Sequence, residues 1–244
     1  TSVATADSHK KDTEDSNQYI AFSDGVIRYS RDGVVFLNKR NKEKWIQPCQ
    51  IQNPIVDVNE DVFAIADVGG NTIMIFQKSG LKGEIETTLP IEKISVSNQG
   101  IVSAILKNES TPQIISYDAV GNILVEHQVN LNSTGYPISL DMSADGENLM
   151  VSYLSTKNGT LKSMVAFYNF GKEGQEKTDN LIYTEDFEQT VVPDVFYMDA
   201  STSVAVGDKS FVIYEGTKSV KKKTEVKLNQ EIRSEFHSDR YIGF

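Results

Sequence analysis

Five segments of the chain begin in the same way, and this repetition limits the possible folds more than any other feature. Pro54, Pro90, Pro137 and Pro193 each begin a short apolar strand, which is followed by a polar turn and a second strand. Glu231 begins a shorter copy without the proline. Proline suits the first residue of a strand because no donor of the hydrogen-bond ladder is lost there. A unit that recurs at a regular spacing indicates a repeat architecture.

A second hairpin accompanies each repeat, and its first strand carries an aromatic residue near its end. These aromatics are Phe36, Phe76, Tyr117, Tyr168 and Tyr214, at spacings of 40, 41, 51 and 46 residues. Four strands about every 40–50 residues, with the most polar strand last, are typical of β-propeller blades. We therefore predict an all-β fold, a β-propeller of four-stranded antiparallel blades. A β-sandwich or barrel, the alternative, would not require the same strand order five times.

The blades are expected to follow a polar tail. Residues 1–18 contain three apolar residues, too few to offset the entropy of ordering the segment, and are predicted to be a tail or linker. The propeller domain is expected over residues 19–244, with about five to six blades. Their expected boundaries are 19–53, 54–89, 90–136, 137–192 and 193–230, with a partial blade at 231–244.

The last residues, RYIGF, are too apolar to remain in solvent and are expected to lie in a sheet. In a closed, monomeric ring they would pair with the N-terminal strands around 19–22 or 26–29. If the native chain continues beyond Phe244, the ring is incomplete at this end, and the strand is an open edge that favours dimerisation.

Charge and composition exclude several classes of function. The chain has 24 Lys and Arg against 34 Asp and Glu, a net charge of −10, which disfavours nucleic acid and anionic membrane surfaces as partners. Hydrophobic residues make up 39%, enough for a core, but no apolar run reaches the roughly 18–20 residues that span a bilayer. Cys49 is the single cysteine, so an internal disulfide framework is impossible.

Long segments of the chain resemble a known family. YSRDGVVFLNKRNKEKW, GYPISLDMSADGENLMVSYL, LKSMVAFYNFGKEGQEKTDNL and FHSDRYIGF are similar to a family of β-propeller proteins from clostridia and related Gram-positive bacteria. More distantly, GVVFLNKRNKEKW is similar to the quinoprotein-like and WD40-like repeat. The resemblance implies an extracytoplasmic, cell-surface propeller, tethered by an N-terminal transmembrane helix that this chain lacks. It carries over no functional residues, because the family has no assigned activity.

Residue types that carry chemistry are scattered. His9, His127 and His237 share no spacing suited to a metal site or a catalytic triad, and we interpret them as solvated or strand-face residues. Cys49 has no neighbouring base that would make it a nucleophile. The quinoprotein-like repeats use a tryptophan in nearly every blade to dock neighbouring blades, whereas Trp45 is the only tryptophan here and is expected to pack between blades. We therefore predict no cofactor and identify no catalytic, cofactor-binding or metal-binding residue.

Charged side chains gather at the expected turns. The acidic groups lack the spacing of a calcium loop and are interpreted as solvated turn carboxylates, with weak surface calcium binding as the alternative. They are Asp57, Glu60 and Asp61, Asp141 with Asp145, and Glu185, Asp186 and Glu188. The lysine run at 218–223 is interpreted as a solvated outer rim that discourages pairing between sheet edges.

Two classes of function remain open. The first is a non-catalytic extracytoplasmic scaffold that binds a protein or a cell-envelope glycan, with the longest insertion, residues 169–192, as the most prominent loop. The second is a glycan-active hydrolase or lyase with facing carboxylates at the channel mouth. The absence of a convergent catalytic set in the sequence favours the first.

Overall fold

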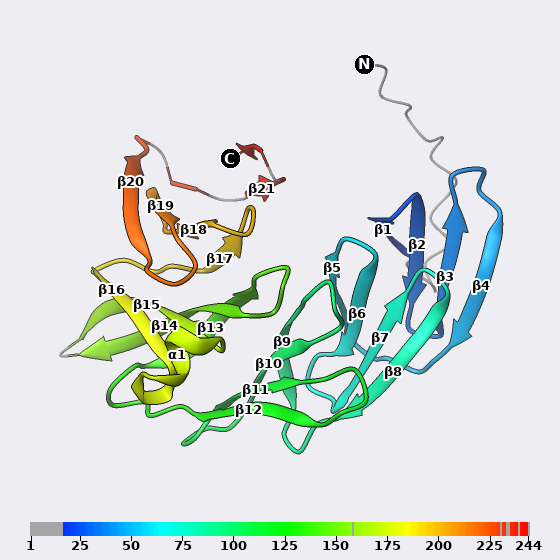
Figure 1. The fold of residues 1–244 in the computed structure, drawn as a ribbon, viewed down its shortest axis with the longest axis horizontal. Coiled ribbons are helices and arrows are strands. Elements are labelled where there is room, and N and C mark those ends of the chain that lie inside the picture. Colours follow the sequence, from blue (N-terminus) through cyan, green and yellow to red (C-terminus); the bar gives the residue numbers. More distant parts are fainter. Residues whose placement is uncertain (1–16, 158, 230, 233–234, 239, 244) are drawn as a thin grey trace.

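The computed structural model describes residues 17–157, 159–229, 231–232, 235–238 and 240–243, and most of these residues lie in strands. They form five four-stranded antiparallel sheets, each built in chain order. In Figure 1 the sheets stand like blades around a central axis and trace an arc that is open on one side. The predicted all-β propeller of four-stranded antiparallel blades is confirmed. The tail predicted for residues 1–18 lies, up to residue 16, outside the described residues.

The first three blades have strands of five to seven residues. Blade 1 consists of β1 (Gln18–Phe22), β2 (Gly25–Ser30), β3 (Gly33–Asn38) and β4 (Glu43–Pro48). Blade 2 consists of β5 (Pro54–Asn59), β6 (Val62–Asp67), β7 (Thr72–Gln77) and β8 (Gly80–Glu86). Blade 3 consists of β9 (Ile91–Val96), β10 (Val102–Leu106), β11 (Gln113–Tyr117) and β12 (Ile123–Gln128).

The fourth blade is the largest. It consists of β13 (Tyr136–Met142), β14 (Asn148–Lys157), β15 (Thr160–Asn169) and β16 (Leu181–Glu188), with α1 (Lys172–Gln175) and the 3-10 turn η1 (Thr178–Asn180) inserted before β16. Blade 5 consists of β17 (Asp194–Tyr197), β18 (Thr202–Val206), β19 (Ser210–Glu215) and β20 (Lys221–Lys227). A short hairpin of β21 (Phe236–His237) and β22 (Ile242–Gly243) follows. Neither helix of the described chain is long enough to cross a membrane.

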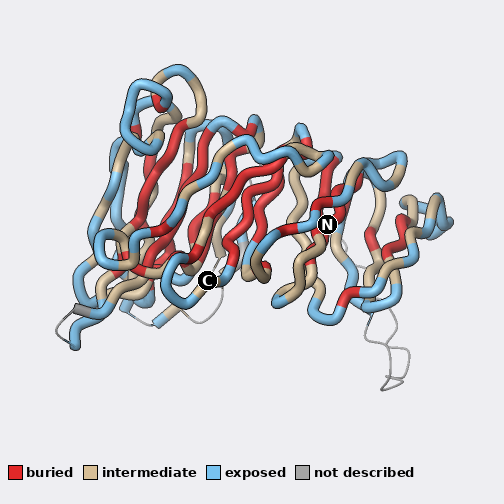
Figure 2. The backbone as a smooth tube through the Cα atoms, turned by 90° about the horizontal axis from the view of Figure 1, so that it is seen from below, coloured by how far each residue is buried: buried red, intermediate tan, exposed pale blue. Residues whose placement is uncertain are grey.

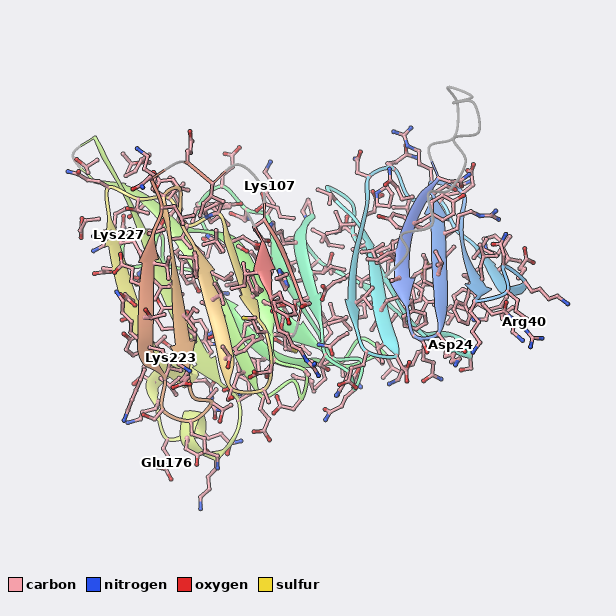
Figure 3. All side chains as sticks on the ribbon, turned by 90° about the horizontal axis from the view of Figure 1, so that it is seen from above. Asp24, Arg40, Lys107, Glu176, Lys223 and Lys227 are labelled. Carbon is pink, nitrogen blue, oxygen red and sulfur yellow. The ribbon has the colours of Figure 1, made fainter. Side chains whose placement is uncertain are left out.

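The cores lie between neighbouring blades, because each sheet turns one apolar face to the blade before it and the other to the blade after it. The first strands meet near the axis, β5 with β9, β9 with β13 and β13 with β17, and the fourth strands are sheet edges. Buried residues accordingly concentrate along the strands, and exposed residues lie in the turns at both ends (Figure 2). In Figure 3, Glu176 of the blade 4 insertion projects from one end of the molecule and Arg40 of blade 1 lies at the other.

Trp45 packs between blades 1 and 2, as predicted. Its ring stacks on Phe76 of β7, with centroids 5.4 Å apart and an angle of 5° between the planes. Its Nε1 donates a hydrogen bond to the carbonyl of Lys78 at 3.0 Å. The indole therefore fills the apolar space between the blades while its polar atom keeps a partner.

The pairing with the N-terminal strands that a closed ring would give the C-terminal strand is not formed by the described residues. Ile242 of β22 pairs with His237 of β21 in a local two-stranded sheet, and β1 pairs with β2. The hairpin lies at the opening of the arc (Figure 1), where Ile242 and Ile232 pack on the apolar face of blade 5 around Phe196. The apolar C-terminal segment is thus in a sheet, as expected. Its partner strand lies in the same hairpin, and Ile242 packs on blade 5.

Candidate functional site

A row of inter-blade hydrogen bonds crosses the inner strands. In each bond a side-chain oxygen of one inner strand accepts the backbone N–H of the next inner strand. The three bonds are Val96 N to Asp57 Oδ2 (2.7 Å), Met142 N to Ser95 Oγ (2.9 Å) and Tyr197 N to Asp141 Oδ2 (2.6 Å). These hydrogen bonds therefore connect blades 2, 3, 4 and 5 at corresponding positions of their inner strands.

The two carboxyl groups of this row have strongly shifted acidities. Burial raises the pKa of Asp57 to about 6. Burial also raises the pKa of Asp141 to about 8, and the neighbouring Asp57 charge adds to the rise. The second oxygen of Asp141, Oδ1, accepts a hydrogen bond from Ser95 Oγ at 2.9 Å. Both oxygens of Asp141 are therefore engaged in holding the blades together.

These positions correct the sequence interpretation. Asp57 and Asp141 are not turn carboxylates, because they lie within β5 and β13 and bond to the next blade. Glu60 and Asp61 do lie at the exposed turn that follows β5. Asp145 caps its own turn by accepting hydrogen bonds from the Ser143 hydroxyl (2.6 Å) and from a backbone N–H (3.0 Å). The described residues contain no group of three His, Cys, Asp or Glu side chains that could hold a metal ion.

The row ends at the C-terminal hairpin. Asp194 of β17 accepts a hydrogen bond from Ser139 Oγ at 3.1 Å. Burial, together with the neighbouring Asp194, raises the pKa of Glu235 to about 8. His237 lies in β21, and its ring stacks on that of Phe196, with centroids 3.6 Å apart and an angle of 1° between the planes. Burial lowers the pKa of His237.

A pocket of about 770 Å³ lies between blades 3 and 4, away from this row. Blade 3 contributes the end of β12 and the loop that follows it, and blade 4 contributes β14, β15, η1 and β16. A volume of this size is typical of small-molecule sites. Its lining residues are Glu126, His127, Gln128, Val129, Asn130, Ser133, Thr134, Tyr153, Met164, Tyr168, Asp179, Leu181 and Thr184.

The wall of this pocket contains hydrogen-bonding groups that the protein does not fully satisfy. The hydroxyls of Tyr153 and Tyr168 lie 2.7 Å apart and share one hydrogen bond in a buried setting. The His127 ring packs on Tyr168, with centroids 5.1 Å apart, and its Nε2 is buried without a hydrogen-bond partner among the described residues. Burial lowers the pKa of His127, against an opposing effect of Asp179, so the imidazole is neutral near pH 7. A buried atom without a partner calls for an explanation.

The insertion of blade 4 forms one side of the pocket. Its base is fixed by Asn169, whose Oδ1 accepts the Gly174 backbone N–H at 3.1 Å and whose Nδ2 donates to Asn148 at 2.9 Å. A Cβ at Gly174 would lie 1.5 Å from the Asn169 carbonyl oxygen, so only glycine allows this close approach. The sequence placed the insertion at 169–192, but residues 181–188 are β16, and the true insertion is the turn with α1 and η1.

Other sequence candidates prove to be structural. Cys49 is half-buried, and burial, followed by the Asp32 charge, raises the pKa of its thiol, which lowers the fraction of the nucleophilic thiolate. The lysine run forms ion pairs along the outer edge of blade 5, so its positive charge is largely compensated. These pairs are Lys222 with Glu185 (2.8 Å) and Glu225 (2.9 Å), Lys218 with Glu173 (3.1 Å), and Lys223 with Glu215. His9 lies outside the described residues.

The sheets and their arrangement define a β-propeller, and solved propellers match it. The WD40 domain of Neurospora crassa Pan2 is 13% identical, with a TM-score of 0.54, 81% of this chain covered and 60% of that one. Kluyveromyces lactis Hsv2 is 10% identical, with a TM-score of 0.58, and the match covers 90% of this chain and 75% of that one. Kuenenia stuttgartiensis hydrazine synthase is 13% identical, with a TM-score of 0.59, and the match covers 86% of this chain and 66% of that one. The chain thus spans less than two thirds of the Pan2 domain.

The chain belongs to the family of unknown function DUF5711, whose profile matches residues 1–244. No curated protein matches the chain. The structural neighbours show the fold alone at 10–13% identity, and their names cover different activities. Function therefore has to be argued from the site.

Proposed function

We propose that this protein is a non-catalytic binding module whose ligand occupies the pocket between blades 3 and 4. One observation carries the proposal: a turn that the sheet does not need adds a charged residue to the pocket. The turn with η1 brings Asp179 to a cavity of about 770 Å³ whose other walls are strands and a loop of blades 3 and 4. Binding residues are often found on loops that a rigid scaffold positions.

The inner-strand carboxyl groups support a structural rather than a catalytic role for the axis. The shifted pKa of Asp141, about 8, is what a general acid of a glycan hydrolase would need, and it is the single observation in favour of that alternative. Both oxygens of Asp141 are occupied by Tyr197 and Ser95, however. A substrate would have to break an inter-blade bond to reach them, which makes the binding module the better supported function.

We further propose that the module acts outside the cytoplasmic membrane and that its ligand comes from the cell envelope. The similarity of the quoted segments to extracytoplasmic propellers supports this location. Protease treatment of intact cells that produce the full-length protein tests it. Digestion without lysis supports the proposal, and protection until lysis contradicts it.

A thermal-shift screen against a panel of amines, sugars, anions and envelope oligosaccharides tests the binding function. Thr184→Trp fills the pocket from the exposed edge strand β16, and Thr224→Trp on the edge strand β20 of blade 5 is its matched control. We expect at least one compound to stabilise the wild type and the control but not Thr184→Trp. If no compound depends on the pocket in this way, the proposed function is wrong.

A further inference from the structure

We propose that the pocket between blades 3 and 4 selects a small organic cation that also carries hydroxyl groups, the chemistry of an amino sugar or amino alcohol. This inference rests on the proposed function, because it specifies the ligand class of the same pocket. Three properties of the wall carry it: its charge, its hydrogen-bonding groups and its apolar surface.

The wall is negatively charged and has no compensating cation. Asp179 is the carboxylate that faces Tyr168 and the histidine of the wall, and no lysine or arginine is among the lining residues. Asp179 forms no ion pair with another described residue. Asp179 lies close enough to His127 and Tyr168 to affect the acidity of both. A ligand with an ammonium group would supply the missing partner, whereas an anion would be repelled.

The neutral groups of the wall require a ligand that also accepts and donates hydrogen bonds. The hydroxyls of Tyr153 and Tyr168 hold two hydrogens but share one hydrogen bond, so one hydrogen is left for another acceptor. Both tyrosines are buried, at 2% and 7% exposure, so the remaining hydrogen is directed by a fixed wall rather than by a mobile surface group. Thr184 and Ser133 add exposed hydroxyls at the pocket edge. A polyhydroxylated body matches these groups.

The shape of the site limits the ligand further. Met164 and Leu181 provide apolar surface between the polar groups, which suits the C–H face of a sugar ring or a short alkyl chain. Asp179 adopts a left-handed conformation, with a φ of 55°, and Asn180 follows with a φ of 59°. Asparagine tolerates this conformation as well as aspartate does. Asp179→Asn therefore removes the charge without disturbing the turn.

Isothermal titration of the full chain with glucosamine and with glucose tests the charge requirement, because the two differ in an ammonium against a hydroxyl group. We expect glucosamine to bind and glucose to bind at least about tenfold more weakly, as for the loss of a charge-assisted hydrogen bond. Asp179→Asn should weaken glucosamine binding by a similar factor without changing the melting temperature. Glu109→Gln, which removes one exposed charge from a loop outside the pocket, should leave binding unchanged.

Each result of these titrations decides the proposal. Equal binding of glucosamine and glucose, or unchanged binding by Asp179→Asn, would overturn the cation requirement and leave the binding function in place. No binding of either compound, with a pocket-dependent anion found in the screen, would overturn the ligand class alone. A free amino sugar and an amino-sugar unit of a glycan offer the same chemistry, so a glucosamine tetramer is titrated in parallel. Tighter binding of the tetramer identifies the glycan as the source.

Discussion

Asp141 Oδ2 accepts the backbone N–H of Tyr197 at 2.6 Å, so a carboxyl group of blade 4 holds the inner strand of blade 5. Asp57 makes the corresponding bond from blade 2 to Val96 of blade 3. A hydrogen bond between the inner strands fixes two blades at the point where they are closest. Protonation of these carboxyl groups is therefore linked to the stability of the fold.

The first prediction concerns this linkage. Because the pKa of Asp141 is raised in the fold to about 8, the folded state binds more protons than the unfolded state between about pH 4 and 8. The free energy of unfolding should therefore fall as pH rises through this range, with a contribution from Asp141 of at most about 1.4 kcal/mol per pH unit. Asp141→Asn keeps an acceptor for Tyr197 and removes the titration. Urea denaturation at several pH values should show a flatter dependence for this variant.

Asp145→Asn is the matched control for this measurement, because Asp145 lies at an exposed turn of the same blade. It should leave the slope between about pH 4 and 8 close to that of the wild type. An identical slope in wild type and Asp141→Asn would show that Asp141 does not titrate in this range.

A second prediction uses the tyrosine pair at the pocket. Tyr153→Phe or Tyr168→Phe leaves one buried hydroxyl without its partner and should lower the free energy of unfolding by about 1–3 kcal/mol. The double variant removes both polar atoms, so its cost should be smaller than the sum of the single costs. Denaturation of the three variants measures the coupling. Additive costs would mean that the two hydroxyls do not stabilise each other.

Much of the fold follows from the sequence because its determinants are local. Phe36, Phe76, Tyr117, Tyr168 and Tyr214 were expected at equivalent places of successive blades, and all five are buried in third strands. Their period reflects the geometry of one blade, which each segment encodes by itself. The polar fourth strands were equally visible, because an edge strand has one side in water.

The relations between blades are less accessible to sequence reasoning. Asp57 and Asp141 resemble turn carboxylates in sequence, and only the neighbouring inner strand shows that their oxygens have backbone partners. The pocket joins His127 of blade 3 to Asp179 of blade 4, which lie 52 positions apart without a shared motif. The insertion that contains Asp179 could be found as the longest interruption of the repeat. Its partner surface on blade 3 could not, because it depends on how the two blades pack.

A third prediction tests whether the insertion positions the pocket. Gly174→Ala places a Cβ against the Asn169 carbonyl oxygen and should displace the turn that carries Asp179. Binding of a pocket ligand should weaken at least about tenfold, a change of about 1.4 kcal/mol, while the circular dichroism spectrum remains that of the wild type. Gly171→Ala is the control, because its φ of −78° is ordinary and its nearest contacts, at 3.2 Å, are side-chain atoms. Equal affinities of the two variants for the ligand would show that the insertion does not position the pocket.

A fourth prediction concerns the C-terminal hairpin. Ile242 packs on the apolar face of blade 5, and Ile242→Ser should expose part of that face and lower the free energy of unfolding by about 1 kcal/mol. Tyr241→Ala in the same hairpin should have little effect, because Tyr241 is 76% exposed. Hydrogen exchange of the backbone amides at 235–243 reports the docking directly. Equal exchange in wild type and Ile242→Ser would show that the hairpin does not depend on this contact.

The protection of these amides from exchange should also depend on pH, because Glu235 and His237 affect the docking of the hairpin in opposite directions. Burial and Asp194 raise the pKa of Glu235 to about 8, so the contribution of this carboxyl group to docking is lost as pH rises through about 8. Burial lowers the pKa of His237, so its contribution is lost as pH falls below the unfolded value of about 6.5. Protection should therefore fall as pH rises from about 6.5 to 8, because the Glu235 carboxyl group is still losing its contribution there while the contribution of His237 is already complete. Glu235→Gln should abolish the loss of protection at alkaline pH and leave the loss at acidic pH unchanged. If the variant still loses protection at alkaline pH, a different group controls the docking of the hairpin on Phe196.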